Sequence, residues 1–155
     1  MSCVRIRDVI GGGIIPWPRP IPCPPGGNDN TPNAVNWSNI VFNVADDFGD
    51  ITSQQITGIS SSITLKVEDV STSPNTEVYY RVDSSQQTGS VFGKPTSPWA
   101  KLAETAPYTT FNVNNNQWVS FACWGDSKVS ADTLTVVNTS DGNATLDTFT
   151  VQSNP

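Results

Sequence analysis

The acidic side chains near residue 50 are the groups in this chain best placed to do chemistry. Asp46, Asp47 and Asp50 lie close together, and Glu68 and Asp69 could supply further carboxylates. Two carboxyl groups about 5 to 9.5 Å apart can hydrolyse a glycosidic bond, and several loop carboxylates together can bind calcium. The alternating D-x-D-x-D-G spacing of a helix-loop-helix calcium site is missing. We expect solvated carboxylates and no metal, with Asp46, Asp47 and Asp50 as the calcium ligands if this loop binds one.

The chain contains no histidine. This removes the Ser-His-Asp and Cys-His nucleophile systems and the commonest transition-metal ligand. The three cysteines, Cys3, Cys23 and Cys123, have no C-x-x-C spacing and predict no zinc site. Cys123 alternates with Val119 and Phe121, so we expect it to be a small buried apolar residue. Cys3 and Cys23 could form a cross-link to each other or to a neighbouring chain, or remain a reduced, buried pair. We expect no enzyme activity and no cofactor.

The first 32 residues differ in composition from the rest of the chain. Prolines at alternate positions between Pro16 and Pro24 fix the backbone near the polyproline II conformation and remove amide donors. A solvated spacer has no use for large apolar side chains, yet this segment carries several. We therefore predict an extended N-terminal arm over residues 1–32 that docks on a partner; the alternative is a linker held by a packing contact. The predicted partner-binding residues of the arm are Ile14, Ile15, Trp17, Arg19 and Ile21.

Charge is distributed unevenly between this arm and the remaining body. The arm carries a net charge of +1, and residues 33–155 carry five basic against twelve acidic residues, a net charge of −7. A negative body cannot neutralise a run of phosphates, so we expect no nucleic-acid binding. No apolar run approaches the ~20 residues that span a bilayer, and no secretion signal is evident, so we expect no membrane association and synthesis in the cytoplasm.

Hydrophobic residues in the body alternate with a period of two. Residues 63–68 and 77–82 each place apolar side chains at every second position, which predicts half-buried strands. Residues 134–137 and 146–151 flank a run rich in Asn, Ser and Gly and predict a hairpin. At most one helical turn is expected, at residues 99–105. Seven or so short strands predict a two-sheet antiparallel β-sandwich over residues 33–155.

Trp118 and Trp124 cannot face the same side of a strand as Val119, Phe121 and Cys123, because successive side chains point to opposite faces. The face with the tryptophans is therefore exposed, or it is covered by the arm or by a neighbour. An exposed aromatic face usually marks an interface. We predict a subunit contact through Trp118 and Trp124 in preference to a sugar-binding platform, which would use Trp37, Trp99, Trp118 or Trp124.

The segments 118–125, 134–142 and 146–151 together resemble the immunoglobulin-like modules of tailed-phage virion proteins. The resemblance covers about Asn33 to Val151. Antibody domains are a poor match, because they need two bridging cysteines and this body has only Cys123. The resemblance implies an immunoglobulin-like sandwich and a structural virion protein that is assembled in the host cytoplasm.

Within that class, the arm favours a capsid decoration or cement subunit that forms a homo-oligomer and binds the major capsid protein. A tail, neck or baseplate accessory subunit would dock through such an arm in the same way. The two other function classes are a carbohydrate-binding or adhesion module and a small glycan-acting enzyme. Fold alone does not decide between these functions.

Overall fold

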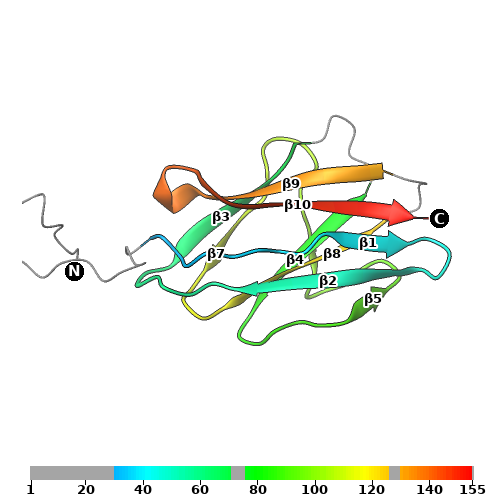
Figure 1. The fold of residues 1–155 in the computed structure, drawn as a ribbon, viewed down its shortest axis with the longest axis horizontal. Coiled ribbons are helices and arrows are strands. Elements are labelled where there is room, and N and C mark those ends of the chain that lie inside the picture. Colours follow the sequence, from blue (N-terminus) through cyan, green and yellow to red (C-terminus); the bar gives the residue numbers. More distant parts are fainter. Residues whose placement is uncertain (1–29, 71–75, 126–129, 155) are drawn as a thin grey trace, which may run out of the picture.

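The fold is all-β, as the alternating sequence pattern predicts (Figure 1). The computed structural model describes residues 30–70, 76–125 and 130–154. These residues form ten strands and one short 3₁₀ turn, in the order β1 (Ile40–Asn43), β2 (Phe48–Gln55), β3 (Ile63–Asp69), β4 (Glu77–Asp83), β5 (Ser90–Phe92), β6 (Ala100–Lys101), β7 (Thr110–Val113), β8 (Trp118–Trp124), β9 (Ser130–Asn138), η2 (Thr139–Asp141) and β10 (Ala144–Asn154).

The strands form one strongly curled sheet with the order β6-β4-β8-β2-β1-β10-β9-β3-β7, and β5 pairs with β2 off this path. The sheet makes a half-barrel (Figure 1). Strand β2 links its two halves, because Phe48 and Gly49 pair with β1 whereas Ile51 to Gln55 pair with β8. The prediction of a purely antiparallel arrangement is wrong at one place: β1 runs parallel to β10, with Ile40 opposite Val151. The strand that opens the body lies beside the strand that ends it, and no local pattern encodes that pairing.

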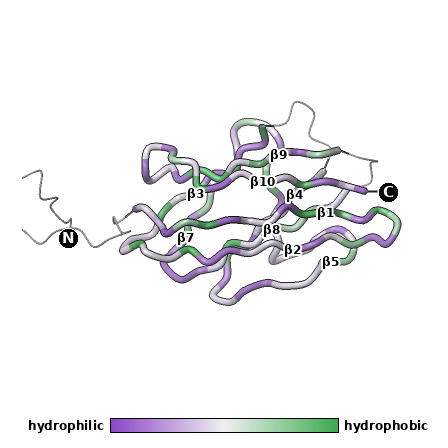
Figure 2. The backbone as a smooth tube through the Cα atoms, viewed as in Figure 1, coloured by the Kyte–Doolittle hydropathy of each residue, from purple (hydrophilic) through white to green (hydrophobic). Residues whose placement is uncertain are grey.

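The curled sheet encloses a single hydrophobic core. Strand β3 alternates strictly between buried and half-buried residues, with Ile63, Leu65 and Val67 facing inward. Figure 2 shows hydrophobic and hydrophilic residues alternating along the strands. The largest fully buried side chains include four aromatic residues, Trp37, Phe42, Phe121 and Phe149. Apolar burial of this kind stabilises the fold by about 1.5–3 kcal/mol per large side chain.

The predicted hairpin at the C-terminal end is confirmed as β9 and β10. Its connection contains η2, which is capped by the Asn138 side chain accepting a hydrogen bond from the Ser140 amide. Gly142 and Asn143 adopt positive φ angles of 58° and 61°, which glycine and asparagine tolerate best. The turn residues therefore specify the hairpin locally.

Residues 99–105, where at most one helical turn was expected, contain no helix. Ala100 and Lys101 form β6, which pairs with Tyr80 and Tyr79 of β4. Pairing with a long neighbouring strand overrides the weak local preference of this short segment. No helix among the described residues is long and apolar enough to cross a membrane.

Candidate functional site

Seven of the predicted site residues lie outside the residues that the structure describes. They are the predicted docking residues and the two arm cysteines, namely Ile14, Ile15, Trp17, Arg19, Ile21, Cys3 and Cys23. Their roles stay predictions. What the structure shows is the place where the arm joins the body.

The junction is fastened to the tip of the β9–β10 hairpin. Asn30 donates from Nδ2 to the Ser140 carbonyl at 3.1 Å, and its own carbonyl accepts from Asn138 Nδ2 at 2.6 Å. Thr31 donates from Oγ1 to Asp141 Oδ2 at 3.0 Å. The described part of the chain therefore begins at this tip, at the end of the long axis away from the C-terminus (Figure 1).

Trp118 and Trp124 of β8 are half-buried on the face opposite Val119, Phe121 and Cys123, which are completely buried in the core. This opposite placement was predicted, but Trp124 also packs against the core, with its ring centroid 6.3 Å from that of Phe42. On that face the cross-strand register places Trp118 opposite Asp83 and Trp124 opposite Glu77. Ser120 and Ala122, between the two tryptophans, are fully buried. Something therefore covers the middle of this face.

The cover is the chain's own connection between β4 and β6. Ser53 Oγ lies 2.6 Å from Ser120 Oγ and donates to the Gln87 carbonyl at 2.7 Å. Further along the connection, the Lys94 ammonium lies 5.1 Å from the centre of the Trp124 ring. The expectation that the face is either exposed or covered by the arm or a neighbour therefore needs correction. No local sequence pattern predicts this cover, because these contacts join segments that are distant in the chain.

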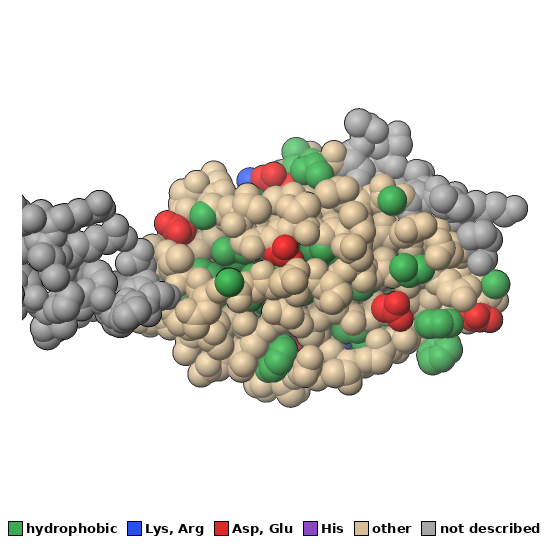
Figure 3. Space-filling model, viewed as in Figure 1, with side chains coloured by type: hydrophobic (Ala, Val, Ile, Leu, Met, Phe, Trp, Pro, Cys, Tyr) green, Lys and Arg blue, Asp and Glu red, His purple; other side chains and the backbone are tan. Residues whose placement is uncertain are grey.

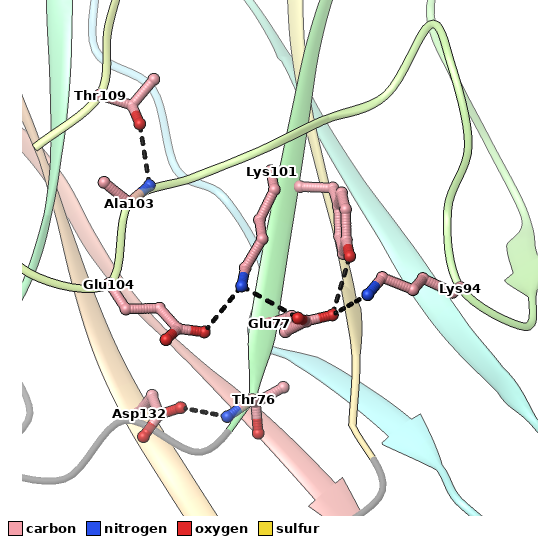
Figure 4. Close-up of polar contacts among 9 residues, drawn as sticks. Thr76, Glu77, Lys94, Lys101, Ala103, Glu104, Thr109 and Asp132 are labelled. Atoms are coloured by element: carbon pink, nitrogen blue, oxygen red, sulfur yellow. Dashed lines mark hydrogen bonds and ion pairs between the residues drawn. The ribbon is translucent and has the colours of Figure 1, made fainter.

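Glu77 is the centre of a charged cluster at one edge of this face (Figure 4). Its carboxylate accepts from Lys101 Nζ at 2.9 Å, Lys94 Nζ at 3.2 Å and Tyr79 Oη at 2.8 Å. Lys101 also reaches Glu104 at 3.5 Å. Burial alone would raise the pKa of Glu77, but the hydrogen bonds from Lys101, Tyr79 and Lys94 outweigh it and lower the pKa. The carboxylate is thus held ionised as a structural anchor for the covering segment.

A second polar group lies at the other end of the same face. Arg81 binds Asp83 through two hydrogen bonds, of 2.6 and 2.8 Å, and its guanidinium lies 5.4 Å from the centre of the Trp99 ring. The hydrogen bond to Asp83 raises the pKa of Arg81. Trp99 and Trp118 are both half-buried here. Partly accessible aromatic rings thus lie beside a fixed Arg–Asp pair.

Trp37 cannot belong to a sugar-binding platform. Its side chain is 2% exposed, and its Nε1 donates to the Val119 carbonyl inside the core. Its role is to fill the core, and the other three tryptophans named for the platform remain partly accessible.

The three aspartates named as calcium candidates are exposed, with Asp46 and Asp47 in the β1–β2 turn and Asp50 in β2. Asp46 accepts a hydrogen bond from Asn43 Nδ2 at 2.9 Å, and Asp47 has a φ of 55°. Among the described residues, no group of three or more histidine, cysteine, aspartate or glutamate side chains is arranged to hold a metal ion.

An aromatic pair of one exposed and one half-buried ring lies beside this turn and was missed in the sequence. Phe92 of β5 is 78% exposed and stands opposite Phe48 of β2, with the ring centroids 5.8 Å apart. The sequence signal was weak, because β5 has only three residues and Phe48 lies among aspartates. The pairing of β5 with β2 creates the patch.

Cys123 is buried and free, as predicted. Burial, with a smaller contribution from the charge of Asp50, raises the pKa of its thiol to about 12. The thiol therefore stays protonated and acts as a small apolar side chain.

No protein-family model matches the chain, and no curated protein has a matching sequence. Among solved structures, the N-terminal domain of PorA aligns with 81% of this chain and 87% of its own, at 7% identity and a TM-score of 0.30. A likeness this distant carries no argument about function.

Proposed function

We propose that this protein is a structural virion component, a capsid decoration or cement subunit that is fastened by its N-terminal arm. In this proposal the body is an immunoglobulin-like module, the virion is assembled in the host cytoplasm, and the main partner is the major capsid protein. The observation that supports the proposal most is the fastened junction, where Asn30 and Thr31 bind the β9–β10 hairpin.

The junction suits a role in which the arm carries a load. Three hydrogen bonds join the junction to the hairpin tip between β9 and β10, the two longest strands, so this hairpin would share with the covalent chain any tension on the arm. The body would then be held at the C-terminal end of a docked arm. Many weak contacts repeated over a particle add to a large resistance to disruption.

The same arrangement would serve a tail, neck or baseplate accessory subunit. All these roles need binding rather than turnover, so we propose no enzyme activity. They also need no nucleic-acid contact, in keeping with the negative charge of the body.

Particles assembled with and without the protein test the proposal. We expect particles to form in both cases, and those without the protein to break at a lower temperature. Trp17→Ala should lower the occupancy on particles while the melting temperature of the isolated protein is unchanged. Trp99→Ala, a substitution of the same kind in the body, is the matched control and should retain occupancy. Equal heat resistance with and without the protein would refute the cement role.

A second candidate function is a carbohydrate-binding or adhesion module. It is supported by the surface formed by Arg81, Asp83, Trp99 and Trp118. Surface glycans bound by the isolated protein would favour it, provided that Trp118→Ala abolishes binding and Trp17→Ala does not. The reverse pattern on particles would favour the cement role.

A further inference from the structure

The aromatic pair, in which Phe92 is exposed and Phe48 is half-buried, forms part of a small patch with a defined composition. Phe48 and Phe92 face each other across the β2–β5 ladder, and Asp50 faces Ser90 two residues further along. Alternation along each strand places all four side chains on one side of the ladder. Asp50 and Ser90 are exposed, as is most of Phe92. The patch is therefore an apolar pair with a carboxylate beside it.

The preceding turn adds more negative charge. The Gly93 amide donates to the Asp47 carbonyl at 2.6 Å, which holds the turn against the end of β5. A Cβ at Gly93 would lie 3.5 Å from Asp47 Oδ2, so this carboxylate lies directly beside the strand end. Figure 3 shows hydrophobic atoms projecting at this end of the body between acidic side chains. We call Phe48, Phe92, Asp47 and Asp50 the distal patch.

A ligand for the distal patch should combine apolar side chains with a positive charge. Polyproline segments bind surfaces lined with aromatic side chains, and they lose little conformational entropy in doing so. Residues 14–21 of this chain have that composition, because Trp17 and Arg19 alternate with prolines and isoleucines. The arm is net positive and the body net negative, so the charges are complementary.

We propose that the distal patch binds residues 14–21 of a second copy of this chain, which links copies head to tail. The proposal rests on the docking role proposed above for the arm. The described part of the chain begins at the hairpin tip, whereas β5 and the β1–β2 turn lie at the opposite end of the long axis (Figure 1). If extended, the chain from Trp17 to Asn30 would span about 40 Å, which is enough to reach a neighbour. Such a heterologous contact builds rings or open chains.

Photo-crosslinking of the full chain tests this contact. Phe92 is replaced by p-benzoylphenylalanine, and chains labelled with ¹⁵N are mixed with unlabelled chains before irradiation. We expect cross-links from position 92 to residues 14–21 that join labelled to unlabelled chains. The same replacement at the exposed Ser62 is the control and should give none. Cross-links confined to single chains, cross-links to other segments, or none at all would overturn the proposal.

Sedimentation velocity provides the second measurement. A patch this small predicts weak association, so the full chain should form dimers and longer species only at about 100 µM or above. Phe92→Ser and Trp17→Ala should each weaken association at least tenfold, and the double variant should be no weaker than either single variant. A monomer at every concentration, or additive effects of the two substitutions, would contradict the proposal. If the wild-type chain shows no self-association and Phe92→Ser keeps normal occupancy on particles, this contact is rejected and the cement role still stands.

Discussion

The indole Nε1 of Trp37 donates a hydrogen bond to the backbone carbonyl of Val119 at 2.9 Å, in the middle of the core. The backbone amide of Trp37 is bound at 2.6 Å by Asp147 Oδ2, which follows a register shift in the β9–β10 ladder. The ring packs edge-on against Phe121 at 5.5 Å. One residue outside the strands thus joins β8 to β10 across the core.

This relationship predicts that the indole is needed for its hydrogen bond as well as for its volume. Trp37→Phe should lower the free energy of unfolding by about 1–3 kcal/mol, because the Val119 carbonyl loses its donor in a buried place. Urea unfolding measures the change. Trp118→Phe is the matched control, and on its half-buried site it should cost less than about 1 kcal/mol. Equal losses in the two variants would show that the hydrogen bond contributes nothing.

Glu77 should make the stability of the protein depend on pH in the acid range. Its pKa in the folded protein is lowered from 4.5, so the ionised form stabilises the fold above about pH 4.5, and this stabilisation is lost as the pH falls further. Glu77→Gln should lower the unfolding free energy by about 1 kcal/mol at pH 7, a modest value because both lysines are largely exposed.

The difference between Glu77→Gln and the wild type should shrink as the pH falls below about 4.5 and vanish once the carboxyl group is protonated in the folded protein as well. Thermal melts across pH 3 to 7 measure this. Glu104→Gln removes one charge from the same cluster and should stay within about 0.5 kcal/mol of the wild type at neutral pH. A difference for Glu77→Gln that persists unchanged at pH 3 would rule out the electrostatic explanation.

Gly49 marks a place where two strands approach too closely for a side chain. A Cβ there would lie 2.6 Å from the Cys123 carbonyl oxygen, a backbone atom that cannot move away cheaply. Gly49→Ala should cost about 1–3 kcal/mol of unfolding free energy. Gly142→Ala is the control, because it meets open space and bears only the strain of a φ of 58°. A chemical denaturation curve for Gly49→Ala that matches the wild type would contradict the close approach.

The part of the fold that could be predicted from the sequence is the part set by local alternation. Ile63, Leu65 and Val67 face the core because polar residues separate them, and the turn chemistry of residues 138–143 fixes the last hairpin. The opposite orientation of Trp118 and Val119 follows from the same rule. These features depend only on neighbours in the chain.

The remaining features depend on contacts between distant segments. Strand β5 is only three residues long and exists because Phe48 to Asp50 of β2 pair with it. The buried state of Trp37 could not be seen among its polar neighbours Asn36 and Ser38, because its partner is Val119. The cover over the tryptophan face and the distal patch escaped prediction for the same reason.

Two deletions should distinguish the contribution of the arm to stability from the contribution of the junction. Deletion of residues 1–29 should leave the melting temperature of the body unchanged, since Asn30 and Thr31 still bind the hairpin. Deletion of residues 1–32 removes three hydrogen bonds and should lower the unfolding free energy by about 1–2 kcal/mol. Calorimetry measures both. A large loss of unfolding enthalpy in the shorter deletion would show that the arm contributes to the core.

Cys123 should be protected from alkylation in the folded protein. Its thiol is completely buried and its pKa is raised to about 12, so almost no thiolate exists at pH 8. Iodoacetamide should modify it at least ~100-fold more slowly in buffer than in 8 M urea, with the site read by mass spectrometry of the peptide. Cys123→Ala should leave the fold intact and cost about 1 kcal/mol, and this variant confirms the assignment of the labelled peptide. Rapid labelling of Cys123 in buffer would contradict the stable burial of its thiol in the core.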